Sequence, residues 1–232
     1  MKAILLFTAA VAFAMSPFLS TGFSGFSPDQ FPMPQIDPPV QPAGYAFSIW
    51  GLIYAMLLAG SGYGLLKRAD DAGWASYRWP LMLSLVIGAA WIPVAGFSPF
   101  WATVLIWLML IGAIWALMVV PRGDRIWLRT PIALYAGWLT AASCVALGLM
   151  LAGHGVSGDR TAALMCLALA LVIAVVVQSI RTDSPEYAGA VIWALAAVVV
   201  SNFSPLNIAV IALSVAGICI LAVVAWRGSY GT

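Results

Sequence analysis

Residues 99–120 read PFWATVLIWLMLIGAIWALMVV, a run without one charged side chain. An α-helix rises about 1.5 Å per residue, so such a run spans the roughly 30 Å of hydrocarbon in a bilayer. Seven further apolar stretches follow the same pattern, separated by short segments that carry the charges. The expected spans are 3–20, 44–66, 79–96, 99–120, 131–153, 160–180, 185–201 and 205–226. The sequence therefore predicts an all-α membrane protein, a polytopic helical bundle of about eight transmembrane helices.

The composition fits a membrane interior and argues against several classes of function. Hydrophobic residues make up 63% of the chain and charged residues 8%, whereas soluble domains carry about 25% charged residues. The basic residues form no stripe, so the expected partner is the lipid bilayer and not nucleic acid. No Asp, Glu, Lys, Arg or His lies in the middle of an expected span, which argues against a proton-coupled or ion-driven carrier. Because no catalytic motif is present either, we expect no enzymatic activity.

The positive charges predict the orientation. With eight spans and a cytoplasmic N-terminus, nine of the ten Lys and Arg residues fall on the inner side and only Arg160 on the outer side. The positive-inside rule therefore places both termini in the cytoplasm. Residues 1–25 also fit a signal peptide, whose cleavage would leave seven spans in the same orientation. Segment 21–43 is proline-rich and has no Lys or Arg, so we expect a lid loop on the outer face.

Cysteine and histidine give no sign of a metal site. Cys144, Cys166 and Cys219 fall in three different spans without CxxC or CxxH spacing, and His154 is the only histidine. We therefore expect neither a disulfide framework nor a bound metal.

Helix entries are predicted where Ser or Thr precedes proline, because the hydroxyl caps free N–H groups and proline suits the first helical position. These pairs are Ser98-Pro99, Thr130-Pro131, Ser184-Pro185 and Ser204-Pro205.

Tryptophan is abundant, with 11 residues, and part of it lies away from the membrane interfaces. Indoles at the expected interfaces need no special role; these are Trp74, Trp79, Trp127 and Trp226. Other aromatic residues share helical faces by their three- and four-residue spacing. One face comprises Phe47, Trp50 and Tyr54, and a face of another helix comprises Tyr135, Trp138 and Ala142. Trp91 lies within a third span.

These aromatic faces have two interpretations. They either pack helix against helix or line an apolar cavity that has a few polar groups. The candidate polar groups are Ser48, Tyr54, Ser84, Tyr135, Thr140 and Ser143. Gly60 and Gly64 form a GxxxG pattern, which permits close helix approach either within the chain, the favoured use, or in a homodimer.

Three aromatic segments occur in the order and spacing of a known family. Residues 42–54 read PAGYAFSIWGLIY, residues 91–93 read WIP, and residues 135–138 read YAGW, with Ala142 four residues further on. They resemble, in turn, the entry to the second helix, the Trp-Ser-Pro region and the Pro-Tyr-x-x-Trp signature of the tryptophan-rich sensory protein / translocator protein (TspO/MBR) family. The resemblance covers roughly residues 1–153.

The resemblance implies a five-helix membrane unit over residues 1–153, with the lid corresponding to residues 31–43. Members of the family bind porphyrins, sterol-like molecules or other flat apolar ligands inside this unit. A bound porphyrin or other tetrapyrrole is thus an implied ligand, and no cofactor is required. The residues expected to line the site are Phe47, Trp50, Tyr54, Trp91, Tyr135, Trp138 and Ala142.

The chain departs from the family pattern at several positions. Gly88 and Ala146 stand where the family usually has asparagine, Leu134 stands where it has proline, and segment 21–43 lacks the usual loop tryptophan. Residues 154–232 add a three-helix C-terminal extension, which resembles the longer bacterial branch of the family.

The leading hypothesis is a multi-pass protein of the bacterial cytoplasmic (inner) membrane that binds a hydrophobic planar ligand of the tetrapyrrole or sterol-like class, and transports or senses it. The alternative is a structural or assembly subunit of a larger membrane complex. In that case a homodimer or a complex partner would bind through the Gly60 and Gly64 face or through the C-terminal helices.

Overall fold

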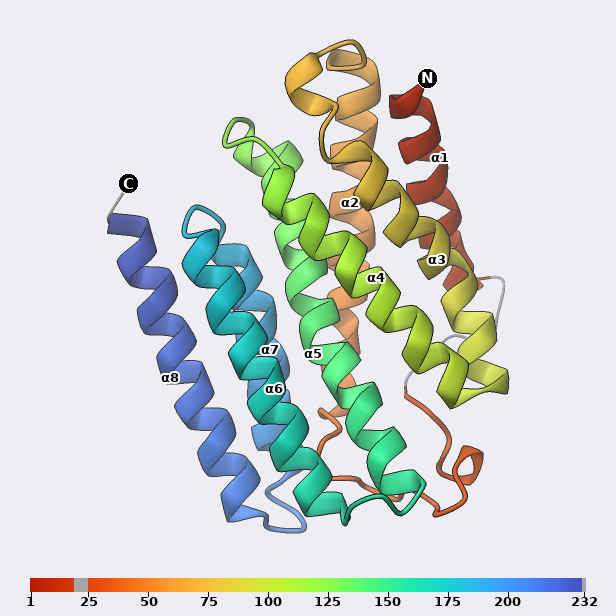
Figure 1. Cartoon of the computed structure of the whole chain (residues 1–232), viewed down its shortest axis with the longest axis vertical. Helices are drawn as coiled ribbons and strands as arrows, with labels where there is room; N and C mark the ends of the chain where they lie inside the picture. Colours follow the sequence, from red (N-terminus) through yellow and green to blue (C-terminus); the bar gives the residue numbers. More distant parts are fainter. Residues whose placement is uncertain (19–24, 231–232) are drawn as a thin grey trace.

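The computed structural model describes residues 1–18 and 25–230, and this part of the chain forms eight α-helices and no strand (Figure 1). Each helix corresponds to one expected apolar stretch. The end of the expected span 3–20 and the start of the expected loop 21–43 fall at residues 19–24, outside the described residues. The helices are α1 Lys2–Met15, α2 Ile49–Lys67, α3 Arg78–Phe97, α4 Pro99–Val119, α5 Thr130–Gly153, α6 Asp159–Ile180, α7 Pro185–Ser201 and α8 Ile208–Tyr230.

Within the described residues, six helical segments are long and apolar enough to cross a membrane, and two apolar helices are shorter. The long segments are Gly44–Lys67, Ala72–Phe97, Pro99–Val119, Arg125–Gly153, Asp159–Ile180 and Ile208–Gly228. The shorter ones are Lys2–Phe18 and Pro185–Ser201. A 17-residue helix such as α7 is about 25 Å long, which is the lower limit for a span. The expected all-α polytopic membrane fold is confirmed.

The first five helices form a closed ring. α1 packs against α2 and α3, α3 packs against α4, α4 packs against α5, and α5 returns to α2. The order around this first ring is therefore α1, α2, α5, α4, α3. The loop over residues 25–43 covers the end of the bundle opposite the two termini (Figure 1).

A second ring is built on the same central helix. α5 also packs against α6 and α7, and α8 closes this ring by packing against both of them. Of the 24 residues of α5, 17 are buried, because the helix has neighbours on both sides. Small residues allow these contacts: a Cβ atom on Gly137 would overlap the carbonyl oxygen of Tyr187 in α7.

The structure revises two of the predicted helix entries. Ser98 caps α4 as expected, since its hydroxyl oxygen accepts the Trp101 N–H at 3.4 Å. Thr130 is not a cap, because a π-helical turn over Arg125–Arg129 runs directly into α5. Ser204-Pro205 is not an entry either: α8 begins at Ile208, and the side-chain oxygen of Asn207 accepts the Val210 N–H at 3.5 Å.

The third predicted entry, Ser184-Pro185, has the expected position but lacks the expected hydroxyl cap. α7 begins at Pro185 as predicted, but the Ser184 side chain makes no capping hydrogen bond. Proline at the first helical position has no N–H group, so one fewer backbone donor at this helix start needs a hydrogen-bond partner.

Gly60 and Gly64 make close contacts within the chain. A Cβ atom on Gly60 would overlap the carbonyl oxygen of Trp127, and one on Gly64 would lie 2.9 Å from the Trp74 ring. The two glycines thus let α2 approach the segments that precede α3 and α5. A homodimer stays a prediction.

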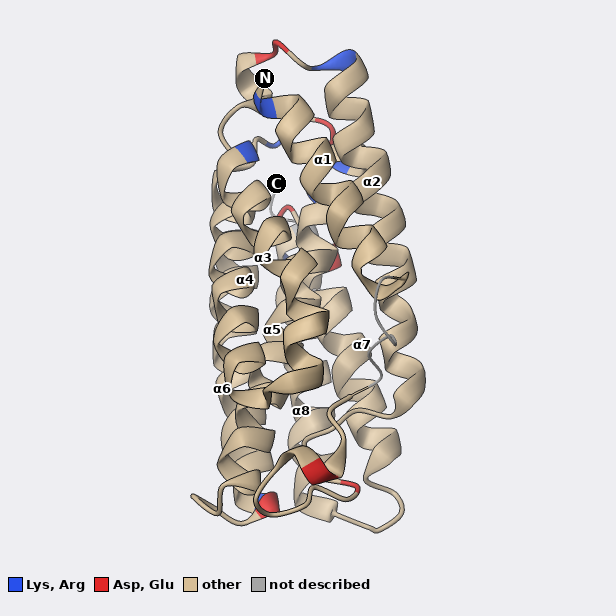
Figure 2. Ribbon diagram, turned by 90° about the vertical axis from the view of Figure 1, so that its right-hand side faces the viewer, with Lys and Arg blue, Asp and Glu red and all other residues tan. Residues whose placement is uncertain are grey.

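Charged residues gather at the two ends of the bundle (Figure 2). Nine of the ten cations lie toward the end that holds both termini, and Arg160, at the start of α6, lies at the opposite end. The helix walls between the ends present apolar side chains, including exposed Phe100, Trp101 and Trp115 on α4. This pattern matches the surface that a bilayer requires.

Candidate functional site

The interior of the first ring is filled by aromatic side chains. The Trp50 ring stacks on Tyr54 with centroids 5.4 Å apart, and its edge meets Trp138 at 6.1 Å. The Phe13 ring of α1 packs edge-on against Trp50 at 5.8 Å, Tyr54 at 5.0 Å and Tyr135 at 5.6 Å. These residues therefore pack helix against helix, which is one of the two interpretations open from the sequence.

Phe13 was not among the expected site residues. It reaches the ring interior because Gly88 of α3 leaves space: a Cβ atom at position 88 would lie 2.6 Å from Cε2 of Phe13. The departure from asparagine at this position was thus a signal in the sequence, since a residue without a side chain implies that a neighbour occupies the space.

Most of the expected polar groups are already used in this packing. Ser84 donates its single hydroxyl proton to the carbonyl oxygen of Met109 at 2.7 Å. The Tyr135 hydroxyl, 2.9 Å from the Ser84 hydroxyl, is therefore the donor in the hydrogen bond between them. By the same reasoning, Thr140 donates to the Ala136 carbonyl at 2.9 Å and accepts from Tyr187 at 2.8 Å. Ser143 donates to the Ile106 carbonyl at 3.2 Å. None of these hydroxyls is an unused donor.

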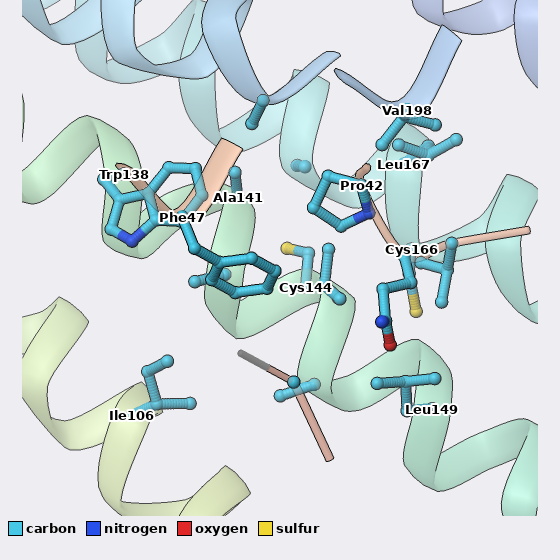
Figure 3. A pocket seen from close by; sticks show the side chains of 18 of the residues that line it. Pro42, Phe47, Ile106, Trp138, Ala141, Cys144, Leu149, Cys166, Leu167 and Val198 are labelled. Carbon is cyan, nitrogen blue, oxygen red and sulfur yellow. The ribbon is translucent and has the colours of Figure 1, made fainter. Parts of the chain in front are cut away.

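An apolar cavity of about 60 Å³ lies beside this cluster, against α5 and beneath the loop (Figure 3). Five of the seven expected site residues line it: Phe47, Trp50, Trp91, Trp138 and Ala142. Tyr54 and Tyr135 are not part of its lining and belong to the aromatic packing of the first ring. Ala146, which stands in place of the family's second asparagine, also faces the cavity and keeps this wall apolar.

The second wall of the cavity comes from the C-terminal helices. α6 contributes Cys166, Leu167 and Ala170, and α7 contributes residues that include Val191 and Ala194. The sequence did not predict this wall, because the resemblance concerned residues 1–153 and the contacts with α6 and α7 join segments far apart in the chain. The only local signal is the alanine-rich character of both helices, which is common in packed membrane helices.

Polar atoms at the cavity are few. The indole Nε1 of Trp138 is buried and has no hydrogen-bond partner among the described residues, although Trp138 is only 2% exposed. Trp91, by contrast, donates its indole N–H to the Ala102 carbonyl at 2.8 Å. Free thiols of Cys144 and Cys166 also line the cavity, from α5 and α6 respectively (Figure 3). The described residues include no group of three or more His, Cys, Asp or Glu that could hold a metal.

The expected lid loop is tied down at several places. The Met33 N–H donates to the Gly153 carbonyl at 2.9 Å, and the Gln30 side chain donates to the Ala95 carbonyl at 2.9 Å. Val40 inserts its side chain against Gly148 of α5 and is 2% exposed. These contacts fix the loop to the ends of α3 and α5.

α7 holds the part of the loop that covers the cavity. Residues of α7 and the next residue, Asn202, donate three side-chain hydrogen bonds to carbonyls of the loop and of the 3-10 turn Gly44–Ser48 that follows it. These bonds run from Trp193 to Ala46 at 3.0 Å, from Ser201 to Gln41 at 2.8 Å, and from Asn202 to Pro39 at 2.9 Å. In return, the Ala43 N–H donates to the Ala197 carbonyl at 3.1 Å. We call these four hydrogen bonds the α7 latch.

The fold and the site together define a class, which is a multi-pass α-helical membrane protein with an apolar cavity closed by a loop. The family model described as TSPO-like protein matches residues 3–225, and the chain belongs to this family. The matched residues extend through α6 and α7 and into α8, so the family relation includes the second ring. Comparison with curated proteins and with solved structures gives no match.

Proposed function

We propose that this protein binds a hydrophobic ligand in the cavity between α5, α7 and the loop. The single observation that carries the proposal is the loop-covered cavity itself, whose lining is mostly apolar and includes Trp138, a residue whose indole N–H has no hydrogen-bond partner among the described residues. An unsatisfied buried donor costs on the order of 1–3 kcal/mol, and a ligand with a hydrogen-bond acceptor would remove that cost. TSPO-like proteins are not typically enzymes, and the proposed role of this site is binding.

The lining chemistry favours a flat or elongated apolar ligand with one polar edge, such as a tetrapyrrole or a sterol-like molecule. Aromatic faces of Phe47, Trp50 and Trp138 can stack on such a ligand. The cavity of about 60 Å³ is smaller than the roughly 300 Å³ of ordinary ligand sites. Binding therefore requires the loop over the cavity to move outward, and release of the α7 latch is the movement that enlarges the space. Binding is the step that a transporter and a sensor share.

The proposal is tested by removing the Trp138 N–H while keeping an aromatic ring. Protoporphyrin is titrated into purified full-length protein, and binding is followed by the absorbance of the porphyrin. Trp138→Phe should weaken binding about fivefold, because one hydrogen bond contributes on the order of 1 kcal/mol. The matched control is Trp115→Phe, since Trp115 is 53% exposed on the outer surface of α4. Equal affinity in both variants would contradict the proposal.

We further propose that the end of the bundle with both termini faces the cytoplasm of a bacterial cell and that the loop faces outward. The support is the concentration of nine cations at the terminal end. A reporter enzyme that is active only outside the cytoplasm should be active when fused in the α5–α6 connection, near Gly155, and inactive when fused at the C-terminus. The reverse pattern would refute this orientation.

A further inference from the structure

Three guanidinium groups meet one carboxylate where the α4–α5 and α6–α7 connections lie together. Arg129 Nη1 lies 2.6 Å from Asp183 Oδ2, and Arg122 Nε lies 3.6 Å from the same oxygen. Arg181, the residue that follows α6, places its Nε 3.0 Å from Asp183 Oδ1. We call these four residues the arginine cluster.

The arginine cluster carries more positive than negative charge. Among the described residues, Asp183 is the only carboxylate that pairs with any of the three arginines. The nearby Glu186 is already engaged, since it lies 2.8 Å from Arg125 and accepts a hydrogen bond from Thr130 at 3.0 Å. Burial would raise the pKa of Asp183, but Arg181 and Arg129 outweigh burial and hold this pKa below its usual value. Asp183 is thus ionised at neutral pH, and three positive charges face one negative charge.

The three arginines differ in how far their donors are satisfied. Arg181 is 6% exposed, and it donates to the carbonyl oxygens of Met118 at 3.1 Å and Val120 at 3.0 Å as well as to Asp183. Arg129 is 8% exposed, and its buried Nε has no hydrogen-bond partner among the described residues. The side chain of Arg122 is 78% exposed. The cluster therefore combines a buried N–H donor without a partner, on Arg129, with an exposed cation, Arg122, that solvent or lipid headgroups can reach.

We propose that the arginine cluster binds a phosphate group, whose oxygens bridge Arg122 and Arg129. Both guanidiniums already converge on one oxygen atom of Asp183, and the exposed side chain of Arg122 gives a second oxyanion a way to approach this point. Phosphate oxygens suit the planar, multiple donors of arginine. An added negative charge also reduces the charge excess, which is costly to keep in a partly buried place.

The phosphate has two chemical sources. The cluster lies toward the cation-rich end of a membrane-spanning bundle, where the headgroup of an anionic phospholipid is at hand (Figure 2). A soluble phosphate compound offers the same group without the acyl chains. The experiment separates these sources.

The test uses full-length protein in a mild, lipid-free detergent, with bound lipid counted by native mass spectrometry. Phosphatidylglycerol, phosphatidylcholine and inorganic phosphate are titrated separately. Phosphatidylglycerol should bind, and Arg122→Gln should weaken its binding about tenfold, because charge-assisted hydrogen bonds are worth roughly 1.5–3 kcal/mol. Since Arg122 is exposed and loosely paired, this substitution should leave the fold unchanged.

Lys67→Gln is the matched control, because it removes one exposed positive charge at the C-terminal end of α2, outside the cluster. It should leave phosphatidylglycerol binding within about twofold of the parent. A response to inorganic phosphate alone, lost in Arg122→Gln, supports the site with a soluble phosphate compound as its source. Equal weakening by both substitutions, unchanged affinity in Arg122→Gln, or equal binding of the two phospholipids would overturn the proposal.

Discussion

Gly88 and Phe13 together determine what fills the first ring. The absence of a side chain at position 88 admits the Phe13 ring, which then contacts Tyr54 and Tyr135 and removes them from the cavity lining. The space available to a ligand consequently lies toward α7 and not at the ring centre. One glycine thus has a consequence for the location of the site.

We expect Gly88→Ala to destabilise the protein, because its Cβ atom would lie 2.6 Å from Phe13 and 3.0 Å from Met109. Overpacking of this kind costs about 1–3 kcal/mol, and thermal unfolding in detergent measures it. Gly51→Ala is the control, since no atom lies within 4 Å of a Cβ atom there. In a Phe13→Ala background, Gly88→Ala should be nearly neutral. An equal loss of stability in both backgrounds would show that Phe13 is not the cause.

At the residue scale, the sequence predicted those features that depend on local spacing. Phe47, Trp50 and Trp138 were expected at the site and do line the cavity, because three- and four-residue spacing fixes which side chains share a helical face. Tyr54 and Tyr135 were expected beside them but turn toward Phe13. The rotation of each helix about its axis depends on the helices that pack against it. The spacing of residues within one helix does not predict those contacts.

At the scale of elements, α7 links the loop to the C-terminal helices. The α7 latch connects one helix of the second ring to the segment that covers the cavity, so α7 holds this segment in place. The boundaries of α7 followed from the sequence, because charges and a Ser-Pro pair mark them. Its hydrogen bonds to the loop did not, since they join residues about 150 positions apart, as Trp193 and Ala46 illustrate.

Weakening the α7 latch should loosen the loop without altering the helices. The double variant Trp193→Phe with Ser201→Ala removes two of the four hydrogen bonds of the α7 latch. If each contributes about 1 kcal/mol, amide exchange of residues 39–46 should accelerate by roughly tenfold or more. Hydrogen exchange with mass spectrometry provides the measurement.

The control for the latch is Thr103→Val, because the Thr103 hydroxyl donates only within α4, to the Pro99 carbonyl at 2.8 Å. Exchange in residues 39–46 should then equal that of the parent. Unchanged loop exchange in the double variant would mean that the contacts at Gly153 and Ala95 hold the loop by themselves.

At the scale of the whole molecule, the two rings form one unit around α5. The sequence predicted the eight helices, because apolar length and the placement of charges determine them. It predicted a five-helix unit over residues 1–153 followed by a three-helix extension, and this division stays a prediction. In the structure α5 packs against α6 and α7 as well as α4, and the family model extends over both rings. The cavity belongs to this shared arrangement, since α5 and α7 supply facing parts of its wall.

The most direct test of the shared cavity is to fill it from the C-terminal side. Ala194 of α7 is 3% exposed and lines the cavity, so Ala194→Phe would place a ring where the ligand is expected. The measurement is protoporphyrin affinity of full-length Ala194→Phe and, from the next turn, Val198→Phe, each with parental helicity. We expect binding to weaken about tenfold or more, because overpacking costs about 1–3 kcal/mol. Parental affinity in both folded variants would contradict it.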